Sequence, residues 1–552
     1  MPSKSMNDLL HTWRRYKLDY LIFALILGSY LFVACQKLAT VPVPETDEAY
    51  MLHVSYEMLN NGRLAMPFRR FLGGHIETNW HSLTPLYYVL LAGFMKLTGW
   101  GVLEGRIFNL ITAILLIIVV YIIARKMFDW RVGLCSVVLL MSDAVFFEHA
   151  KLLRNDYIAA FAAMLAYLLY EIAEERKRSI WFIATGLAAG ACVMLHSNGL
   201  YMLGAIPLMM LLTRGWRILK SKDLYQYLLS ALAVMAYEII SDLLDYKNFL
   251  LQYRGDKLHF GVLSLQGWWE NISNEPSRYV RWYAGGALFQ NVPRTTLHVF
   301  QVLAGVALIY LMVVALRTLR NGSVMSEPRV RILVVTICLI LFQAIVAGHK
   351  EAYYIAHLAP WYALCAGILL MDAWNFLWSI RVRGWAHAAT LSNIAVAMFV
   401  ICALLFGLQL ARQTRRYIRE VQNPELASFE EIKGVLRSAV PEGVCPVVIK
   451  FPVMYLVFPE RIDCFANIED RMMENVDLDG KEYVVLLPNA GHAKRAQRAD
   501  ELEAKYPLIA ELKNTAYGDI TAYYTGQNDA IRSRPVLTYV FFGRLRGHGQ
   551  SE

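Results

Sequence analysis

The chain has 552 residues, of which 57% are hydrophobic and only 18% charged, and its mean hydropathy is +0.37. Soluble domains average roughly 45–50% apolar and about 25% charged residues, and a single soluble core stops growing near about 250–300 residues. These values exclude a disordered chain and a single soluble globule, and they indicate a polytopic membrane protein. The net charge of +9 does not point to nucleic acid, because lysines and arginines gather in short loops between apolar segments.

Apolar segments long enough to cross a bilayer recur along most of the chain. A spanning helix needs about 20 mostly apolar residues, and about 17 suffice. The sequence predicts about eleven such helices, at 18–36, 107–124, 132–147, 157–173, 180–196, 199–213, 224–241, 298–316, 332–347, 353–378 and 389–411. We therefore expect a polytopic α-helical membrane protein.

The basic loops set the expected orientation, because loops rich in lysine and arginine stay in the cytoplasm. Such clusters occur in every second loop, at 125–131, 176–178, 214–222, 317–331 and 381–383. The intervening loops are then expected on the outer face, at 37–106, 148–156 and 242–297. The apolar stretch from Pro85 to Trp100 would invert this order, so we interpret it as an interfacial or re-entrant helix on the outer face.

The tail differs from the rest of the chain in being far more polar. Strand-like and helical stretches alternate in it, with strands expected at 447–451, 461–465 and 483–488 and helices at 427–438 and 494–505. This alternation predicts a small soluble α/β domain in the outer compartment. We expect a transmembrane domain over 1–415 and the extracytoplasmic domain over 416–552.

Two adjacent carboxylates, Asp47 and Glu48, open the first outer segment. Thr46 is expected to cap a helix that begins there and ends near Gly62. One interpretation is structural, because acidic side chains are favourable in the first turn of a helix. The functional interpretation is a carboxylate, fixed at the membrane surface, that acts as a general base on an incoming nucleophile.

A second polar site occupies the short loop between the third and fourth predicted spans. It contains Glu148 and Asp156, with Arg154 between them. Arg154 and Asp156 can form an interfacial ion pair, which is worth little if it is exposed. Because the loop is short, both carboxylates must lie at the mouth of the helix bundle. A histidine with carboxylates can also bind a metal, but Glu148, His149 and Asp156 match no recognised ligand spacing. Metal binding, with Asp47, Glu148 and Asp156 as the candidate ligands, is therefore a less favoured alternative.

A third polar site opens the tenth predicted span on the outer side. It begins with His349, Lys350 and Tyr353, and Tyr354 and His357 follow. Lysine and tyrosine at a membrane interface often only anchor a helix. The functional alternative is a clamp of cationic and hydroxyl donors for a phosphate group. Such donors opposite carboxylates suit a reaction in which a phosphate leaves while a hydroxyl attacks.

The distribution of the remaining polar residues favours an enzyme over a transporter. Glu238 and Asp372 lie near the ends of expected spans, and the middles of the spans hold almost no ionisable group. A proton-coupled transporter is expected to carry such groups near the bilayer midplane. The loop at 242–297 mixes tryptophan and tyrosine with arginine and lysine, a pattern that fits a sugar or lipid head-group site and an aromatic belt equally well.

Several short motifs together resemble a known family. In chain order they are Asp47-Glu48-Ala49-Tyr50, Leu83-Thr84-Pro85-Leu86-Tyr87-Tyr88, Glu104-Gly105-Arg106, Arg125-Lys126-Met127-Phe128, Arg154-Asn155-Asp156, residues 186–200 and the element from Tyr353 to Pro360. The chain resembles the polyprenyl-phosphate-sugar-dependent membrane glycosyltransferases of the GT-C class, which include protein O-mannosyltransferases and the lipid A aminoarabinose transferase. His196 and its neighbours stand where this family usually has a lysine, and the tail matches no known domain.

This resemblance implies transfer of a sugar from a polyprenyl phosphate to an acceptor hydroxyl, with inversion at the anomeric carbon. Asp47 then resembles the general base, with Glu48 supporting it, while Asp156 and Arg154 organise the site. The donors expected to stabilise the departing lipid phosphate are His349, Lys350 and Tyr353. The rest of the expected substrate-binding set is Tyr87, Glu148, Tyr354 and His357.

The expected partners are a polyprenyl-phosphate sugar donor, membrane lipids and an acceptor that is a lipid, a polysaccharide or a protein. The sequence indicates no particular cofactor, and the need for a divalent cation is left open. The expected location is the bacterial inner (plasma) membrane, with the active site on the extracytoplasmic side. Two alternatives remain: a transporter or flippase of a lipid-linked sugar, and a non-catalytic envelope assembly protein.

Overall fold

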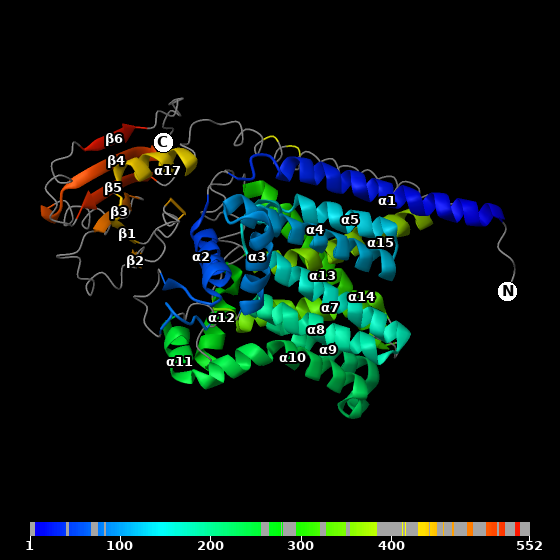
Figure 1. Ribbon diagram of the computed structural model, residues 1–552. Helices are drawn as coiled ribbons and strands as arrows, with labels where there is room; N and C mark the ends of the chain where they lie inside the picture. Colours follow the sequence, from blue (N-terminus) through cyan, green and yellow to red (C-terminus); the bar gives the residue numbers. More distant parts are fainter. Residues whose placement is uncertain are drawn as a thin grey trace.

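A bundle of long helices makes up most of the computed structural model, and a mixed sheet lies beyond one end of it (Figure 1). The residues that the structure describes are 6–39, 44–67, 75–81, 84–255, 264–277, 279, 294–320, 327–348, 354–382 and, in the C-terminal region, 411, 415, 429–440, 442–449, 456–457, 466–468, 483–489, 504–515, 518–524 and 536–540.

The bundle consists of the apolar helices predicted as spans. They are α1 (Met6–Ala34), α4 (Val102–Met127), α5 (Trp130–Ser142), α7 (Asp156–Arg176), α8 (Ser179–Leu195), α9 (Leu200–Arg214), α10 (Lys222–Leu244), α13 (Arg294–Arg320), α14 (Pro328–Ile345) and α15 (Ile355–Val382). Among the described residues, seven apolar helices are long enough to cross a membrane, and three shorter apolar ones match the first, third and fifth predicted spans. The expected eleventh span, 389–411, lies almost wholly outside the described residues. The polytopic helical fold is confirmed, and the count of eleven stays a prediction.

Small residues let helices of the bundle approach closely. Gly186 and Gly190 of α8 face α10, where a Cβ atom on Gly186 would lie 2.2 Å from the Tyr227 carbonyl oxygen. A Cβ atom on Gly190 would lie 2.5 Å from the carbonyl oxygen of Ala231. Glycine is therefore required at both positions, as at many contacts between membrane helices, where packing takes the place of hydrophobic collapse.

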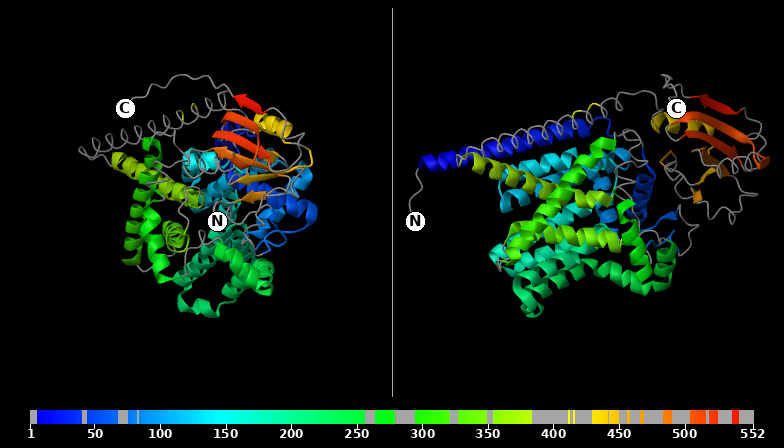
Figure 2. Two further views of the ribbon diagram at one scale, coloured as in Figure 1. Left: turned by 90° about the vertical axis from the view of Figure 1, so that its left-hand side faces the viewer. Right: turned by 180° about the vertical axis from the view of Figure 1, so that it is seen from behind.

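The basic residues predicted to be cytoplasmic are paired with acids at one end of the bundle. The Arg125 guanidinium donates to Asp19 at 2.9 Å, Arg214 to Asp223 at 2.6 Å and Arg331 to Glu171 at 2.8 Å. The two further views show α1 extending to this end, opposite to the end near the sheet (Figure 2). The charges that set the predicted orientation thus also tie neighbouring helices together.

Shorter elements gather at the opposite end of the bundle. They are α2 (Thr46–Asn61), α3 (Pro85–Thr98), α6 (Ala144–His149), α11 (Tyr246–Gly255) and α12 (Leu265–Ser277). The 3₁₀ turn η2 (Ser197–Gly199) is at the same end, beside the start of α7, and the 3₁₀ turn η3 (Gly215–Lys220) follows Arg214 at the other end. In Figure 1, α2 and α3 lie across this end at a steep angle to α1. The helix expected from Pro85 is therefore present as α3, and its depth in a membrane stays a prediction.

The start of α2 differs by one residue from the expectation. Thr46 was expected as the cap, but Glu45 has the extended backbone of the N-cap and Thr46 is the first helical residue. The Glu48 carboxylate accepts the backbone N–H of Glu45 at 3.1 Å, which stabilises this start. Gly62, with φ of +63°, ends the helix as expected.

The C-terminal region contains a six-stranded sheet with the strand order β2-β1-β3-β5-β4-β6. The strands are β1 (Cys445–Ile449), β2 (Ala466–Ile468), β3 (Tyr483–Asn489), β4 (Leu508–Thr515), β5 (Gly518–Tyr524) and β6 (Leu537–Val540), preceded by α17 (Phe429–Ala439). β3 pairs with β1 in parallel and with β5 antiparallel.

Two of the expected strands, 447–451 and 483–488, correspond to β1 and β3, and the expected helix at 427–438 corresponds to α17. The expected strand at 461–465 and most of the expected helix at 494–505 lie outside the described residues. The sequence analysis did not predict β4, β5 and β6. The domain boundary near 415 stays a prediction.

Candidate active site

Glu48 is a buried anchor between three segments of the chain. The Arg106 guanidinium of α4 donates to both of its carboxylate oxygens, at 2.8 and 2.7 Å. The backbone N–H of Leu153 donates to it at 2.9 Å, and neither Glu48 nor Arg106 has any exposed surface. Arg106 also donates to the Leu38 carbonyl oxygen. A buried charge paired in this way holds the first turn of α2 against α4 and the loop before α7.

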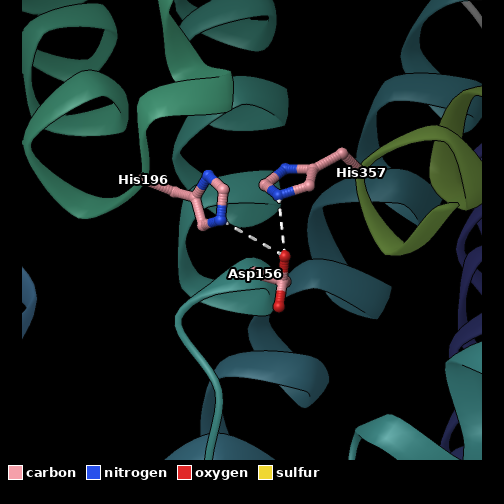
Figure 3. Close-up of side chains that lie close together, drawn as sticks. All are labelled: Asp156, His196 and His357. Atoms are coloured by element: carbon pink, nitrogen blue, oxygen red, sulfur yellow. Dashed lines mark hydrogen bonds and ion pairs between the residues drawn. The ribbon is translucent and has the colours of Figure 1, made fainter. Parts of the chain in front are cut away.

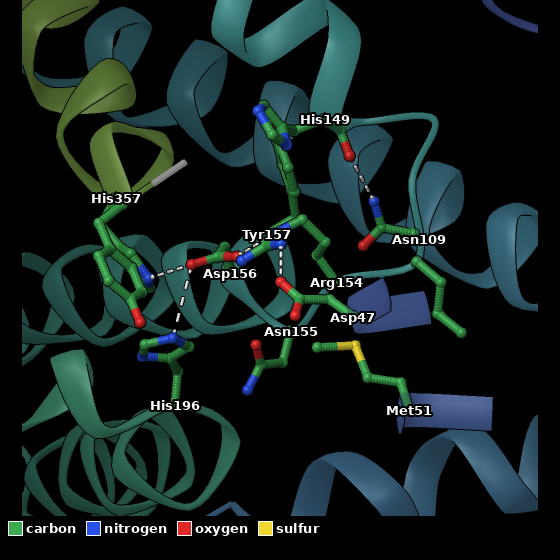
Figure 4. A network of polar contacts seen from close by, with 12 residues as sticks. Asp47, Met51, Asn109, His149, Arg154, Asn155, Asp156, Tyr157, His196 and His357 are labelled. Carbon is green, nitrogen blue, oxygen red and sulfur yellow. Dashed lines mark hydrogen bonds and ion pairs between the residues drawn. The ribbon is translucent and has the colours of Figure 1, made fainter. Parts of the chain in front are cut away.

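Arg154 contacts three carboxylates, and Figure 4 shows two of them, Asp47 and Asp156. Its Nε donates to Asp156 at 2.8 Å, and its Nη1 donates to Asp47 at 2.5 Å and to Glu45 at 3.3 Å. Asp156 is the first residue of α7, whereas Asp47 and Glu45 belong to the start of α2. The predicted pairing of Arg154 with Asp156 is therefore present, and it is buried rather than exposed.

Asp47 differs from the other carboxylates of this group in its accessibility. Its side chain is 37% exposed, whereas that of Asp156 is 1% exposed. Among the described carboxylates that contact Arg154, Asp47 and Glu45 are the ones that a substrate at the end of the bundle can reach. Burial, with the nearby charges of Asp47 and Glu48, raises the pKa of Glu45 to about 7, although Arg154 opposes this shift.

Asp156 also contacts two histidines from distant segments. Its Oδ1 faces the Nε2 of His357 in α15 at 3.1 Å and the Nε2 of His196, between α8 and η2, at 3.5 Å. The Tyr354 ring packs edge-on against His196, with ring centroids 5.6 Å apart. Two of the expected substrate-binding residues, Tyr354 and His357, therefore lie beside Asp156.

The other expected site residues have separate surroundings. Glu148 pairs with the Lys151 ammonium at 3.7 Å, and the buried Tyr87 hydroxyl donates to the Met51 sulfur at 3.4 Å. Among the described residues, one group of possible metal ligands has its ligand atoms close together, and it consists of Asp156, His196 and His357. The metal ligands considered from the sequence, Asp47, Glu148 and Asp156, do not form such a group. His349, Lys350 and Tyr353 lie outside the described residues, so their expected phosphate contacts stay a prediction.

A further histidine ties the outer loops together away from Arg154. His81 contacts Asp242 through Nδ1 at 2.9 Å and Asp245 through Nε2 at 2.8 Å. Its backbone N–H donates to the Gln252 side chain of α11. The sequence analysis named neither this contact nor the role of Arg106 as a partner of Glu48. No periodicity marks such pairs, because their members are brought together only by the fold.

Comparisons with known proteins concern the fold of the chain and the family that it resembles. Residues 82–240 match the family model "Dolichyl-phosphate-mannose-protein mannosyltransferase". A search of curated proteins gave no match. ArnT from Cupriavidus metallidurans bound to undecaprenyl phosphate is 12% identical and has a TM-score of 0.56, covering 93% of this chain and 99% of its own. The oligosaccharyltransferase of Archaeoglobus fulgidus is 14% identical with a TM-score of 0.50, covering 92% of this chain and 74% of its own.

The chain has a GT-C membrane fold. Together with the family match over 82–240, this fold confirms the expected resemblance and the expected class of enzyme, a glycosyltransferase. It also confirms an integral membrane protein.

Proposed function

We propose that this GT-C protein transfers a sugar from a polyprenyl-phosphate donor to an acceptor hydroxyl, with inversion, at the extracytoplasmic face of the membrane. The acceptor is a lipid, a polysaccharide or a protein. Two structures of similar fold support the donor class, because ArnT from Cupriavidus metallidurans is bound to undecaprenyl phosphate and the archaeal oligosaccharyltransferase AglB is in complex with a dolichol phosphate.

The observation that carries this proposal is the contrast between Asp47 and the carboxylates around it. Glu48 is saturated by Arg106 and two backbone N–H groups, and Asp156 is buried against Arg154 and two histidines. Asp47 is partly exposed, whereas Glu48 and Asp156 are buried. Glu45 is also partly exposed, but its pKa is raised to about 7 and it is the N-cap residue of α2, so it is the weaker candidate. A general base has to reach the proton that it removes, so Asp47 is the base and Glu48 positions it.

The chemistry follows from this placement. The Asp47 carboxylate takes the proton of the acceptor hydroxyl while the oxygen attacks the anomeric carbon. The bond from that carbon to the phosphate oxygen breaks on the opposite face, and the electron pair leaves with the lipid phosphate, which inverts the anomeric configuration. Arg154, which contacts both Asp47 and Asp156, holds the base and supplies positive charge beside the developing negative charge.

The roles of the remaining residues are part of the same proposal. His349, Lys350 and Tyr353 would hold the departing phosphate, and Tyr354 and His357 would line the site beside Asp156. The tail 416–552 would form an extracytoplasmic domain next to this site. Its position supports the assignment, because the sheet lies at the same end of the bundle as α2 (Figure 2).

The proposal is tested by replacing the base. Asp47→Asn keeps the size of the side chain and removes the proton acceptor, so transfer of labelled sugar should fall at least about 100-fold. The assay combines purified protein, a polyprenyl-phosphate sugar and membranes from cells lacking the chain, which supply the acceptor. Glu77→Gln, an exposed carboxylate on the same loop region, is the matched control and should transfer normally.

Three results would contradict the proposal. Undiminished transfer by a folded Asp47→Asn protein would remove the base. Flux of a labelled lipid-linked sugar across proteoliposomes without an acceptor would indicate a transporter or flippase. An assembly protein would tolerate alanine at Asp47, Asp156 and Lys350 and lose function when 416–552 is deleted.

A further inference from the structure

Asp156, His196 and His357 form a compact group of nitrogen and oxygen ligands (Figure 3). They come from three separate places in the fold: the first turn of α7, the residue before η2, and α15. One ligand atom from each residue lies within 4.8 Å of the others, and the two imidazole rings are 4.7 Å apart between centroids. All three side chains are buried in the helix bundle.

The spacing of these atoms matches a metal centre better than it matches charge-assisted hydrogen bonds. Hydrogen bonds between a charged nitrogen donor and a carboxylate are usually about 2.7–2.9 Å long. Here the Asp156 Oδ1 lies 3.1 Å from the His357 Nε2 and 3.5 Å from the His196 Nε2. Two atoms that each bind a tetrahedral zinc ion at about 2.1 Å lie roughly 3.4 Å apart. The two distances from the Asp156 Oδ1 are therefore compatible with a cation bound between these atoms.

We infer that Asp156, His196 and His357 bind one divalent transition-metal ion. Two imidazole nitrogens and one carboxylate oxygen suit Zn²⁺ and other first-row ions such as Co²⁺, rather than Mg²⁺ or Ca²⁺, which prefer oxygen ligands. Three protein ligands leave a fourth position for an exogenous ligand, as in catalytic zinc sites.

The groups around the three ligands support this assignment. Arg154 donates to the Oδ2 of Asp156 at 2.8 Å, which fixes the carboxylate with its Oδ1 turned toward the imidazoles. Ligating carboxylates commonly have such a hydrogen-bonded partner. The carboxylates of Asp47 and Glu45, which contact the same guanidinium, offset part of the positive charge that a metal ion adds.

Binding requires one local change at His196. Its Nδ1 accepts the backbone N–H of Asn198 at 3.0 Å, so a neutral ring carries its proton on Nε2. Coordination through Nε2 displaces that proton. A neutral histidine ligand then carries it on Nδ1, which can no longer accept the Asn198 N–H, so the turn at Ser197–Gly199 changes. Because metal binding competes with protonation of the ligands, the affinity for metal rises with pH.

The site is tested with Zn²⁺ and Co²⁺ themselves as probes, and this test does not depend on sugar transfer. The full-length protein is purified in detergent, stripped with a chelator, titrated with metal, desalted and analysed for metal content. We expect one equivalent of metal per chain. His196→Gln and His357→Gln should each weaken binding at least about tenfold.

His149→Gln and His81→Gln are the matched controls, because these two histidines are also buried at the same end of the bundle but do not contact Asp156. Both controls should bind metal like the unmodified chain. His357→Cys, which retains a ligating side chain, should restore binding if the glutamine variant folds poorly. In the unmodified chain, Zn²⁺ should raise the unfolding temperature.

Two outcomes would overturn the inference. One is an unmodified chain that holds no stoichiometric metal across the pH range in which it is folded. The other is unchanged binding by the folded His196→Gln and His357→Gln proteins, which would place any bound metal elsewhere. If the Asp47→Asn protein loses sugar transfer but keeps its full metal content, the role of the base and the metal site are independent. Each proposal can then be contradicted without the other.

Discussion

At the scale of single residues, three neighbouring carboxylates differ because their surroundings differ. Glu48 is fixed by Arg106, Asp156 is buried against Arg154 and two histidines, and Asp47 keeps an exposed face. Identical functional groups can thus be divided between structural and reactive roles by burial and pairing alone. Adjacent positions in the sequence, Asp47 and Glu48, point to opposite environments because successive residues of a helix lie on different faces.

Glu45 should make stability and activity depend on pH near neutrality. Its pKa is raised to about 7, so the folded chain keeps this proton between about pH 4.5 and 7 while the unfolded chain loses it. The contribution of Glu45 to stability is therefore fully present below about pH 4.5 and is lost as the pH rises through 7. Glu45→Gln stays neutral, so it should unfold at a higher temperature than the unmodified chain at pH 8.

The measurement is the unfolding temperature of both purified proteins at pH 4.5, 6, 7 and 8. The advantage of Glu45→Gln should grow up to about pH 7 and then level off. A constant difference between Glu45→Gln and the unmodified chain at every pH would contradict the shifted pKa.

At the scale of elements, the contact of α8 with α10 depends on glycine. Gly190→Ala would place a Cβ atom 2.5 Å from a backbone oxygen of α10, which a side-chain movement cannot relieve. We expect it to destabilise the chain by about 1–3 kcal/mol, as overpacked cores do. Gly204→Ala in α9 meets nothing within 4 Å and should instead stabilise by about 0.5–1 kcal/mol through helix propensity.

Opposite shifts of the unfolding temperature by these two alanine variants, measured on detergent-purified protein, are the expected result. Equal shifts would show that α8 and α10 are not packed through Gly190. Both substitutions add one methyl group to a helix, so a difference between them reports the surroundings of the two glycines.

The elements were predictable from the sequence where a long local pattern specifies them. The length of a span such as α4 follows from the thickness of the bilayer. The bounds of α2 follow from its capping residues and from Gly62. The site was only partly predictable. Asp47, Arg154 and Asp156 were recognisable as charged residues on the outer side, but the contact of Arg154 with Glu45 was not. His357 meets Asp156 across 201 residues of sequence, and no local pattern carries that information. The short strands β4 to β6 were missed because four to eight residues give a weak signal.

At the scale of the whole molecule, charge separates the two ends of the bundle. At the end with the predicted cytoplasmic loops, arginines pair with acids between neighbouring helices, as Arg214 does with Glu174 and Asp223. At the other end, Arg154 gathers carboxylates from α2 and α7 around a partly exposed base. The same type of side chain therefore fixes topology at one end and builds the candidate active site at the other.

The orientation of the molecule follows from this separation and can be measured with two introduced cysteines. Lys177, between α7 and α8, has a side chain that is 60% exposed, and Lys513 of β4 has one that is 43% exposed. In a variant whose native Cys35, Cys445 and Cys464 are serine, Lys513→Cys should react with a membrane-impermeant maleimide from the outer side of intact spheroplasts. Lys177→Cys should react only after permeabilisation, because its loop is one of the basic ones. The reverse pattern would place Asp47 and the sheet in the cytoplasm. Labelling of both cysteines in intact spheroplasts would show that the sheet and the basic loops lie on the same side of the membrane.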